Sequence, residues 1–163
     1  MRERVYFLKP GATIGLFAPA SPSSAAEVDQ AIVFLEEMGF RAKTPASLPK
    51  AKAKATEKAS CYLAGTDDER RFSLHMLMGD PEVKALLAIR GGYGSLRLLP
   101  ALRPLWPLYP PKPIIGYSDL TALHMARLAI SDVGGWHAPM LCDLSAPGHR
   151  KRLKEALLGP LTP

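Results

Sequence analysis

The sequence predicts an α/β fold, a mostly parallel, doubly wound sheet of the Rossmann-like or flavodoxin-like kind that carries a nucleophile elbow. Short, almost continuously apolar runs alternate with segments of helical periodicity, a pattern typical of parallel strands buried on both faces. Each main run ends in a turn rich in Gly or Pro. One turn, Gly116-Tyr117-Ser118, places a single serine between an apolar run and a helix.

The first 44 residues read as a strand, a helix and a second strand. Residues 13–18 (TIGLFA) are expected to form a buried strand. Ser24 and Glu27 form a capping-box pair that starts a helix, and Gly39 ends it. A short strand is expected at 40–44.

The next segment carries the second helix. Residues 45–58 read as a surface loop or weak helix, because they are rich in Pro, Lys and Ala. Thr66 and Glu69 form another capping box, which predicts that a helix begins there. The acidic run 67–69 suits the first turn of that helix, whose dipole favours negative charge. We therefore interpret the run as structural rather than as a metal site.

The clearest buried strand is 83–89 (VKALLAI), and a glycine-rich turn, 90–94 (RGGYG), follows it. Such a turn can direct backbone N–H groups at an anion, or it can simply be a tight connection. The pattern is not GxGxxG and no Walker lysine follows, so we expect no nucleotide phosphate and no cofactor.

The last third contains the serine turn and two further elements. A short helix is expected at 96–102, and a proline-rich stretch then excludes regular helix up to the next strand. Trp106 and Tyr109 are interpreted as packing groups of that stretch. Residues 136–140 (WHAPM) are expected to form another strand and its exit, and 150–158 a final amphipathic helix.

Ser118 allows two interpretations. As a nucleophile elbow, the turn would lift its hydroxyl out of the backbone, with the N–H groups of the following helix facing a developing oxyanion. As a plain N-cap, it would only begin a buried helix. In parallel sheets, sites form beyond the carboxyl ends of the strands. The turns at 19–21, 90–92 and 116–118 should therefore meet at one edge, which favours the elbow.

Composition excludes several classes of protein. A hydrophobic content of 47% with 22% charged residues is that of an ordinary globular protein of one domain. The net charge of +6 comes largely from basic runs at 50–58 and 150–154, which read as solvated faces without a nucleic-acid reading element. Cys61 and Cys142 lie far apart and form neither a disulfide framework nor a metal site.

The N-terminal stretch does not read as a signal peptide, because Lys9-Pro10-Gly11 interrupts its apolar run. No apolar run approaches membrane-spanning length. We therefore expect a cytoplasmic protein with no membrane partner.

Five motifs resemble the LD-carboxypeptidases, the serine peptidase family that includes the microcin C immunity-type peptidases. In order along the chain they are APASP (18–22), YLAGTDDERR (62–71), IRGGYG (89–94), IGYSDLTALH (115–124) and WHAPM (136–140). The pair RGGYG and GYSD at this separation is specific, and the resemblance spans nearly the whole chain. Ala138 departs from the glycine that is common in the family.

The resemblance implies the roles of three site residues. Ser118 would be the nucleophile, and the backbone N–H groups of Asp119 and Gly92 would form the oxyanion hole. Family members are metal-free, cytoplasmic and often dimeric. They hydrolyse the amide between the L-centre of a diamino acid and a terminal D-alanine in murein tetrapeptides, as part of cell-wall recycling.

The resemblance also implies that the site is incomplete. The family's triad is Ser, Glu and His, and the last two lie in a C-terminal domain that this chain lacks, so 1–163 corresponds to the nucleophile-bearing N-terminal domain. His124 lies six positions after Ser118, about 240° around the same helix, and cannot turn back to the hydroxyl. His75, His137 and His149 are not expected to act as the base either. We expect the chain to be inert, or nearly so, without a complementing chain or domain.

The sequence leaves three alternatives. The chain could be a non-catalytic remnant that binds murein peptides or a partner, which predicts an exposed apolar docking patch. It could be a peptidase of the microcin C immunity type. A nucleotide-binding module is disfavoured, because the second strand ends in Lys43-Thr44-Pro45 rather than in an acidic residue.

Overall fold

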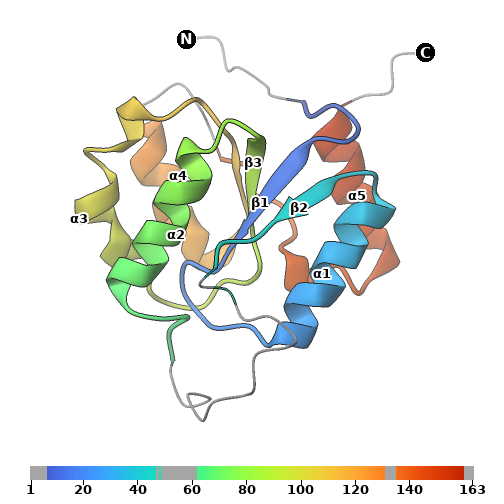
Figure 1. Ribbon diagram of the computed structural model, residues 1–163, viewed down its shortest axis with the longest axis horizontal. Helices are drawn as coiled ribbons and strands as arrows, with labels where there is room; N and C mark the ends of the chain where they lie inside the picture. The colour runs from blue at the N-terminus through green and yellow to red at the C-terminus, as the bar shows by residue number, and fades with distance from the viewer. Residues whose placement is uncertain (1–6, 47, 49–61, 131–134, 160–163) are drawn as a thin grey trace.

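The computed structural model describes residues 7–46, 48, 62–130 and 135–159. Its four strands pair in parallel in the order β2-β1-β3-β4. They are β1 (Thr13–Phe17), β2 (Arg41–Lys43), β3 (Val83–Ala88) and β4 (Ile114–Ile115). This arrangement confirms the predicted parallel α/β fold (Figure 1).

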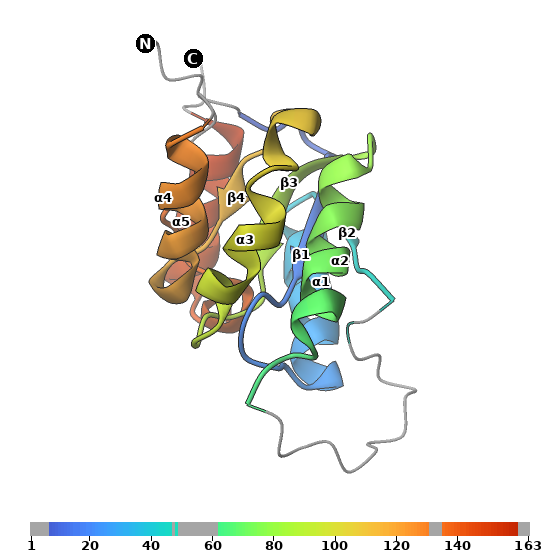
Figure 2. The same ribbon diagram turned by 90° about the vertical axis from the view of Figure 1, so that its left-hand side faces the viewer.

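Helices cover both faces of the sheet, as a doubly wound fold requires. The α-helices are α1 (Ala25–Glu37), α2 (Asp67–Gly79), α3 (Leu99–Leu102), α4 (Thr121–Leu128) and α5 (Pro147–Leu158). Helices α1 and α5 lie on one face, and α2, α3 and α4 lie side by side on the other (Figures 1 and 2). Short 3-10 turns η1 (Ser95–Leu98), η2 (Trp106–Leu108), η3 (Ser118–Leu120) and η4 (Leu141–Asp143) complete the described elements.

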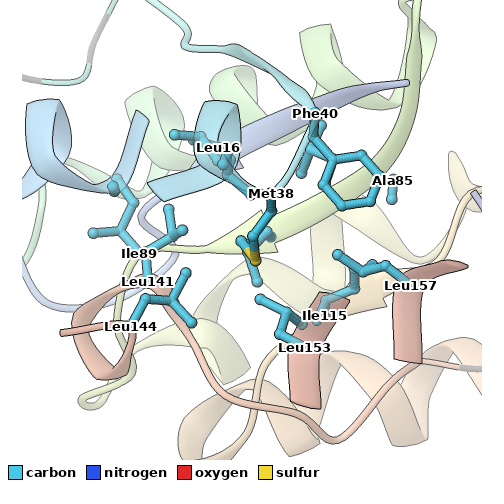
Figure 3. Packing of buried hydrophobic residues seen from close by; sticks show 14 of the residues in the cluster. Leu16, Met38, Phe40, Ala85, Ile89, Ile115, Leu141, Leu144, Leu153 and Leu157 are labelled. Atoms are coloured by element: carbon cyan, nitrogen blue, oxygen red, sulfur yellow. The ribbon is translucent and has the colours of Figure 1, made fainter. Parts of the chain in front are cut away.

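Two apolar cores form because successive strand residues point to opposite faces. Leu87 of β3 belongs to the core beneath α1 and α5, whereas Leu86 belongs to the core beneath α2, α3 and α4. On the first face, Leu153 and Leu157 of α5 point towards Ile115 of β4 (Figure 3). Both cores hold fully buried side chains, so the sheet is a rigid base for the loops at its edge.

Both predicted capping boxes are confirmed. The Ser24 hydroxyl accepts from the Glu27 N–H, and the Glu27 carboxylate accepts from the Ser24 N–H at 2.7 Å. Thr66 and Glu69 repeat the exchange at the start of α2, also at 2.7 Å. These pairs satisfy N–H groups that have no intrahelical acceptor, which is why both helix starts could be located to the residue.

The expected strand at 136–140 is wrong. Trp136 makes a single parallel bridge to Ile115, and the segment continues as an irregular chain into η4. Since β4 is only two residues long, it offers no longer ladder to a neighbour. The final helix begins at Pro147, earlier than expected. Of the loop predicted at 45–58, most lies outside the described residues.

The order β2-β1-β3-β4 places the topological switch point between β1 and β3, where sites in such sheets form. The described ends of the chain meet away from that edge. Leu8 N–H donates to the Leu157 carbonyl at 2.7 Å, and the Phe7 ring covers Gly159. In Figure 1, β1 begins and α5 ends at the same end of the molecule.

Candidate active site

Ser118 occupies a strained turn between β4 and η3. Its φ is +61°, and no other non-glycine residue in the described ranges has a positive φ. Such backbone costs about 1–3 kcal/mol in a residue with a Cβ, so its neighbours must hold it in place. The residue is exposed, whereas the two residues of β4 before it are buried. The turn therefore presents the serine at the sheet edge.

The N-cap interpretation of Ser118 is wrong. The cap of η3 is Tyr117, in an extended conformation, and η3 has no side-chain cap hydrogen bond. Ser118 is itself the first residue of η3. Its hydroxyl therefore remains available for other chemistry.

The glycine turn after β3 packs directly against Ser118. A Cβ added at Gly91 would lie 3.2 Å from the Ser118 Cβ and 3.4 Å from its Oγ. The first of these distances is tighter than ordinary van der Waals contact, so Gly91 is the residue that allows the elbow to approach. Gly91 is buried, while the next glycine, Gly92, is exposed.

The loop after β1 closes on the other side of the glycine turn. Ser21 N–H donates to the Gly91 carbonyl at 3.2 Å. A Cβ at Gly92 would lie 2.0 Å from the Ser21 Oγ, and Gly92 has a φ of +128°, so only glycine fits there. The three strand ends therefore meet at one edge, as the sequence predicted.

Two backbone donors remain free at this edge. Asp119 is the second residue of η3, and the first N–H groups of a helix have no intrahelical acceptor. The Gly92 N–H likewise has no acceptor within the described part of the chain. Asp119 directly follows Ser118, and Gly92 directly follows Gly91, the glycine that packs against Ser118. An oxyanion hole needs donors of this kind.

The Asp119 side chain ties the elbow to the turn after β3. Its Oδ2 accepts from the Ser95 N–H at 2.8 Å. The family resemblance implies a role only for the backbone of Asp119, and no local pattern indicates this side-chain contact, because the partner lies 24 positions away.

Arg70 is a second residue that sequence reasoning missed. Its side chain is 1% exposed, and its Nη1 donates to the Pro19 carbonyl and, at 3.2 Å, to the Gly94 carbonyl. Its Nε donates to the Gly65 carbonyl at 3.3 Å, and its Nη2 pairs with Asp67. One signal existed: Arg70 shares the face of α2 that buries Leu74 and Leu77.

None of the four histidines, all of which lie in described ranges, hydrogen-bonds to Ser118. His75 pairs with Tyr109, and His149 Nδ1 lies 3.2 Å from the Asp143 carbonyl. The ring of the exposed His137 packs against that of Tyr117 in a tilted arrangement, with 5.9 Å between ring centroids. His124 is buried against Gly135, and burial lowers its pKa to about 4, which keeps the ring neutral.

Cys142 is not a competing nucleophile. Its N–H donates to the Ile89 carbonyl at 2.9 Å, which places it near the end of β3. Partial burial, together with the neighbouring Asp143 carboxylate, raises the pKa of its thiol to about 11, so the thiolate that attacks is scarce at neutral pH. Cys61 lies outside the described residues.

The acidic residues of the described ranges do not gather into a metal site. The run at 67–69 serves structural roles, as predicted: Asp67 pairs with Arg70 and Arg97, Asp68 pairs with Arg71, and Glu69 belongs to the capping box. Among the same residues, no helix is long and apolar enough to cross a membrane.

The chain matches known proteins over most of its length. The model of the LD-carboxypeptidase N-terminal domain matches residues 14–138. The probable murein peptide carboxypeptidase of Bacillus subtilis is 40% identical over 134 residues, which cover 82% of this chain and 40% of that protein. The microcin C7 self-immunity protein MccF of Escherichia coli is 31% identical over 82% of this chain and 38% of its own length.

A solved structure shares the same fold. The MccF-like protein from Bacillus anthracis superimposes with a TM-score of 0.76 and 26% identity, over 93% of this chain and 46% of that one. The chain thus spans less than half the length of these relatives.

Proposed function

The chain belongs to the LD-carboxypeptidase family, and we propose that it carries the nucleophile of a serine carboxypeptidase that releases D-alanine from murein peptides. The observation that carries this proposal is the geometry of Ser118. It combines a positive φ, exposure at the strand–helix junction and contact with Gly91. A hydroxyl on a sharp strand-to-helix turn is the arrangement that serine hydrolases use for attack.

The proposed reaction is hydrolysis through an acyl-enzyme. Ser118 Oγ attacks the carbonyl carbon of the L,D-amide and gives its proton to a base. The N–H groups of Gly92 and Asp119 stabilise the oxyanion that forms. The C–N bond then breaks, D-alanine leaves with the proton on its amine, and water releases the second product from Ser118.

The base is proposed to come from another domain or chain. The four histidines make other contacts, and the buried His124 is held neutral by its lowered pKa. A serine hydroxyl without an adjacent base is a weak nucleophile. We therefore expect 1–163 alone to be inert or nearly so, with the glutamate and histidine of the triad supplied by a complementing domain.

The test measures D-alanine release from an L,D-linked murein tetrapeptide. The chain is assayed alone and mixed with the separately produced second half of the Bacillus subtilis relative. We expect release only from the mixture, and a fall of roughly 10⁶-fold when Ser118→Ala replaces the wild-type chain. Ser145→Ala is the matched control, because Ser145 is also an exposed serine. Equal release with Ser118→Ala would refute the nucleophile assignment.

A peptidase of the microcin C immunity type is the second candidate. The relative MccF and the structural neighbour from Bacillus anthracis favour it. Solved structures of MccF hold aminoacyl sulfamoyl nucleosides, such as aspartyl sulfamoyl adenosine. Cleavage of that compound by the same mixture, in preference to the tetrapeptide, would support this candidate over the first.

The third candidate is a non-catalytic role, which predicts an exposed apolar surface. Such a surface lies between α3 and α4, as a hollow of about 670 Å³. It is lined by Leu96, Leu99, Pro100, Arg103, Pro104, Pro107, Ala126 and Ile130. A docked catalytic domain would use the same kind of surface, so the D-alanine assay discriminates between the two readings.

A further inference from the structure

We propose that Arg70 is a positioning residue, which clamps the loops after β1 and β3 and thereby fixes the Gly92 N–H and Asp119. The proposal rests on the proposed function, because it concerns the same oxyanion donors. Arg70 lies on α2 and contacts both loops through buried hydrogen bonds. It is a candidate for positioning, since nothing places its side chain against the reacting atoms.

The first route runs through the loop after β1. Arg70 Nη1 donates to the Pro19 carbonyl, and the Ala20 carbonyl in the same loop accepts from the Ala64 N–H at 2.8 Å. The loop then presents the Ser21 N–H, which donates to the Gly91 carbonyl at 3.2 Å.

That carbonyl and the Gly92 N–H belong to one peptide unit. A trans peptide is planar, so its C=O and N–H point in opposite directions. The bond that Ser21 donates to the carbonyl therefore sets the direction of the Gly92 N–H. If the Pro19 carbonyl loses its hydrogen bond from Arg70, the loop after β1 can move. The peptide that carries the Gly92 N–H can then rotate, because glycine restricts backbone rotation least.

The second route runs through the peptide between Gly94 and Ser95. Its carbonyl accepts from Arg70 Nη1 at 3.2 Å, and its N–H donates to Asp119 Oδ2 at 2.8 Å. A single rigid unit is thus held at one end by Arg70 and at the other by the residue after Ser118. Arg70 acts on both oxyanion donors by separate paths.

Arginine suits this role better than lysine. The planar guanidinium presents five N–H donors in a fixed fork, whereas an ammonium group is a point charge on a flexible stem. Arg70 uses the fork to reach three carbonyls and one carboxylate, that of Asp67, which also pairs with Arg97 at 2.9 Å. A lysine keeps the charge and loses the simultaneous contacts.

The first test uses phenylboronic acid, which mimics the tetrahedral intermediate. Ser118 Oγ forms a bond to boron, the hydroxyl proton passes to solvent, and a boron-bound oxygen occupies the oxyanion position. Binding to the 163-residue chain is followed by boron NMR, with Ser118→Ala as the blank. We expect Arg70→Met and Arg70→Lys each to weaken binding by roughly tenfold or more.

Arg71→Met is the matched control. Arg71 is the next residue of the same helix, and among the described residues its ion pair is with the exposed Asp68, at 3.1 Å. Its substitution should leave the affinity within about twofold. Affinity within twofold of wild type for folded Arg70→Lys would overturn the proposal, because the conservative variant would then suffice. Arg70→Lys also keeps the test decisive if Arg70→Met does not fold.

Amide hydrogen exchange separates positioning from general stability. In Arg70→Lys, we expect faster exchange at Ser21 and Ser95, whose N–H groups donate to the Gly91 carbonyl and to Asp119 Oδ2, with Leu86 and Leu87 of β3 unchanged. Equal acceleration across β3 would mean that Arg70 only stabilises the fold, and it would overturn the proposal. Should the wild type form no adduct at Ser118 even when mixed with the complementing half, the proposed function loses its support, while exchange still decides the role of Arg70.

Discussion

The two ends of α2 each bury a basic side chain, and they use it differently. Near the first turn, Arg70 donates to carbonyls of three separate segments and pairs with a carboxylate. At the other end, Lys112 is also buried, and its Nζ donates to the Leu77 carbonyl at 3.0 Å and to the Asp80 carbonyl. Arg70 joins loops at the site edge, whereas Lys112 closes the end of one helix.

The difference shows that the hydrogen-bond partners of a buried basic side chain determine its structural role. Lys112 satisfies carbonyls that a helix end leaves free, and burial lowers the pKa of its ammonium group. His124, a third buried base, has no partner for Nε2 among the described residues and is neutral. Arg70 joins the loops after β1 and β3, which meet at the site edge, whereas Lys112 joins the segment before β4 to the end of α2. Of these three groups, Arg70 is therefore the one placed to transmit order to the site.

The largest expected effect on stability comes from Arg70→Met. Removing the cation leaves several buried carbonyls without donors, so the free energy of unfolding should fall by about 3–5 kcal/mol. Lys112→Met should cost about 1–3 kcal/mol, because it frees only the carbonyls at one helix end. Urea unfolding of both variants measures the two losses. A larger loss of stability for Lys112→Met than for Arg70→Met would contradict this ranking.

The next effect concerns His124 and pH. Its folded-state pKa of about 4 lies below the usual 6.5, so the unfolded chain takes up the proton first as pH falls. The contribution of His124 to the free energy of unfolding is fully present above about pH 6.5. It falls by about 2–3 kcal/mol as the pH is lowered from 6.5 to 4.

His124→Gln tests that expectation, since glutamine does not titrate. Urea unfolding at pH 7 and pH 4.5 should show a smaller loss in the variant than in the wild type. The comparison between the proteins cancels the contribution of carboxylates common to both. Equal losses would show that His124 is not the group responsible.

The smallest effect is a gain. Ser118→Gly removes the Cβ from a residue with a φ of +61°, and it should raise the free energy of unfolding by about 0.5–1 kcal/mol. The same substitution at Ser95, which lies in a 3-10 turn without a positive φ, should lower it. Thermal unfolding checks both signs, and a destabilised Ser118→Gly would argue against strain at the elbow.

Local rules explain what the sequence could predict. Strands β1 and β3 follow from their apolar runs, and α1 and α2 begin where reciprocal capping pairs lie three residues apart. The meeting of the three strand ends followed from the parallel sheet. The strand at 136–140 did not form because β4, to which Trp136 bridges, is two residues long, a length that the apolar pattern did not reveal.

The remaining features of the site depend on distant contacts. Arg70 meets Pro19 at a separation of 51 residues and Gly94 at 24, and neither interval leaves a periodic signal. The strain at Ser118 is a backbone angle, which a serine in the sequence does not disclose. The sequence could therefore suggest the nucleophile, but not the residues that hold the site in shape.

The contact between Phe7 and Gly159 has a consequence for tethering. It places the end of α5 beside the start of β1, and Ser118 follows the carboxyl end of a strand parallel to β1. A polypeptide fused after Gly159 must travel at least the length of β1, about 17 Å, to bring a catalytic group to the serine. A flexible linker well beyond five residues would span that distance and raise the local concentration of the fused group to the millimolar range.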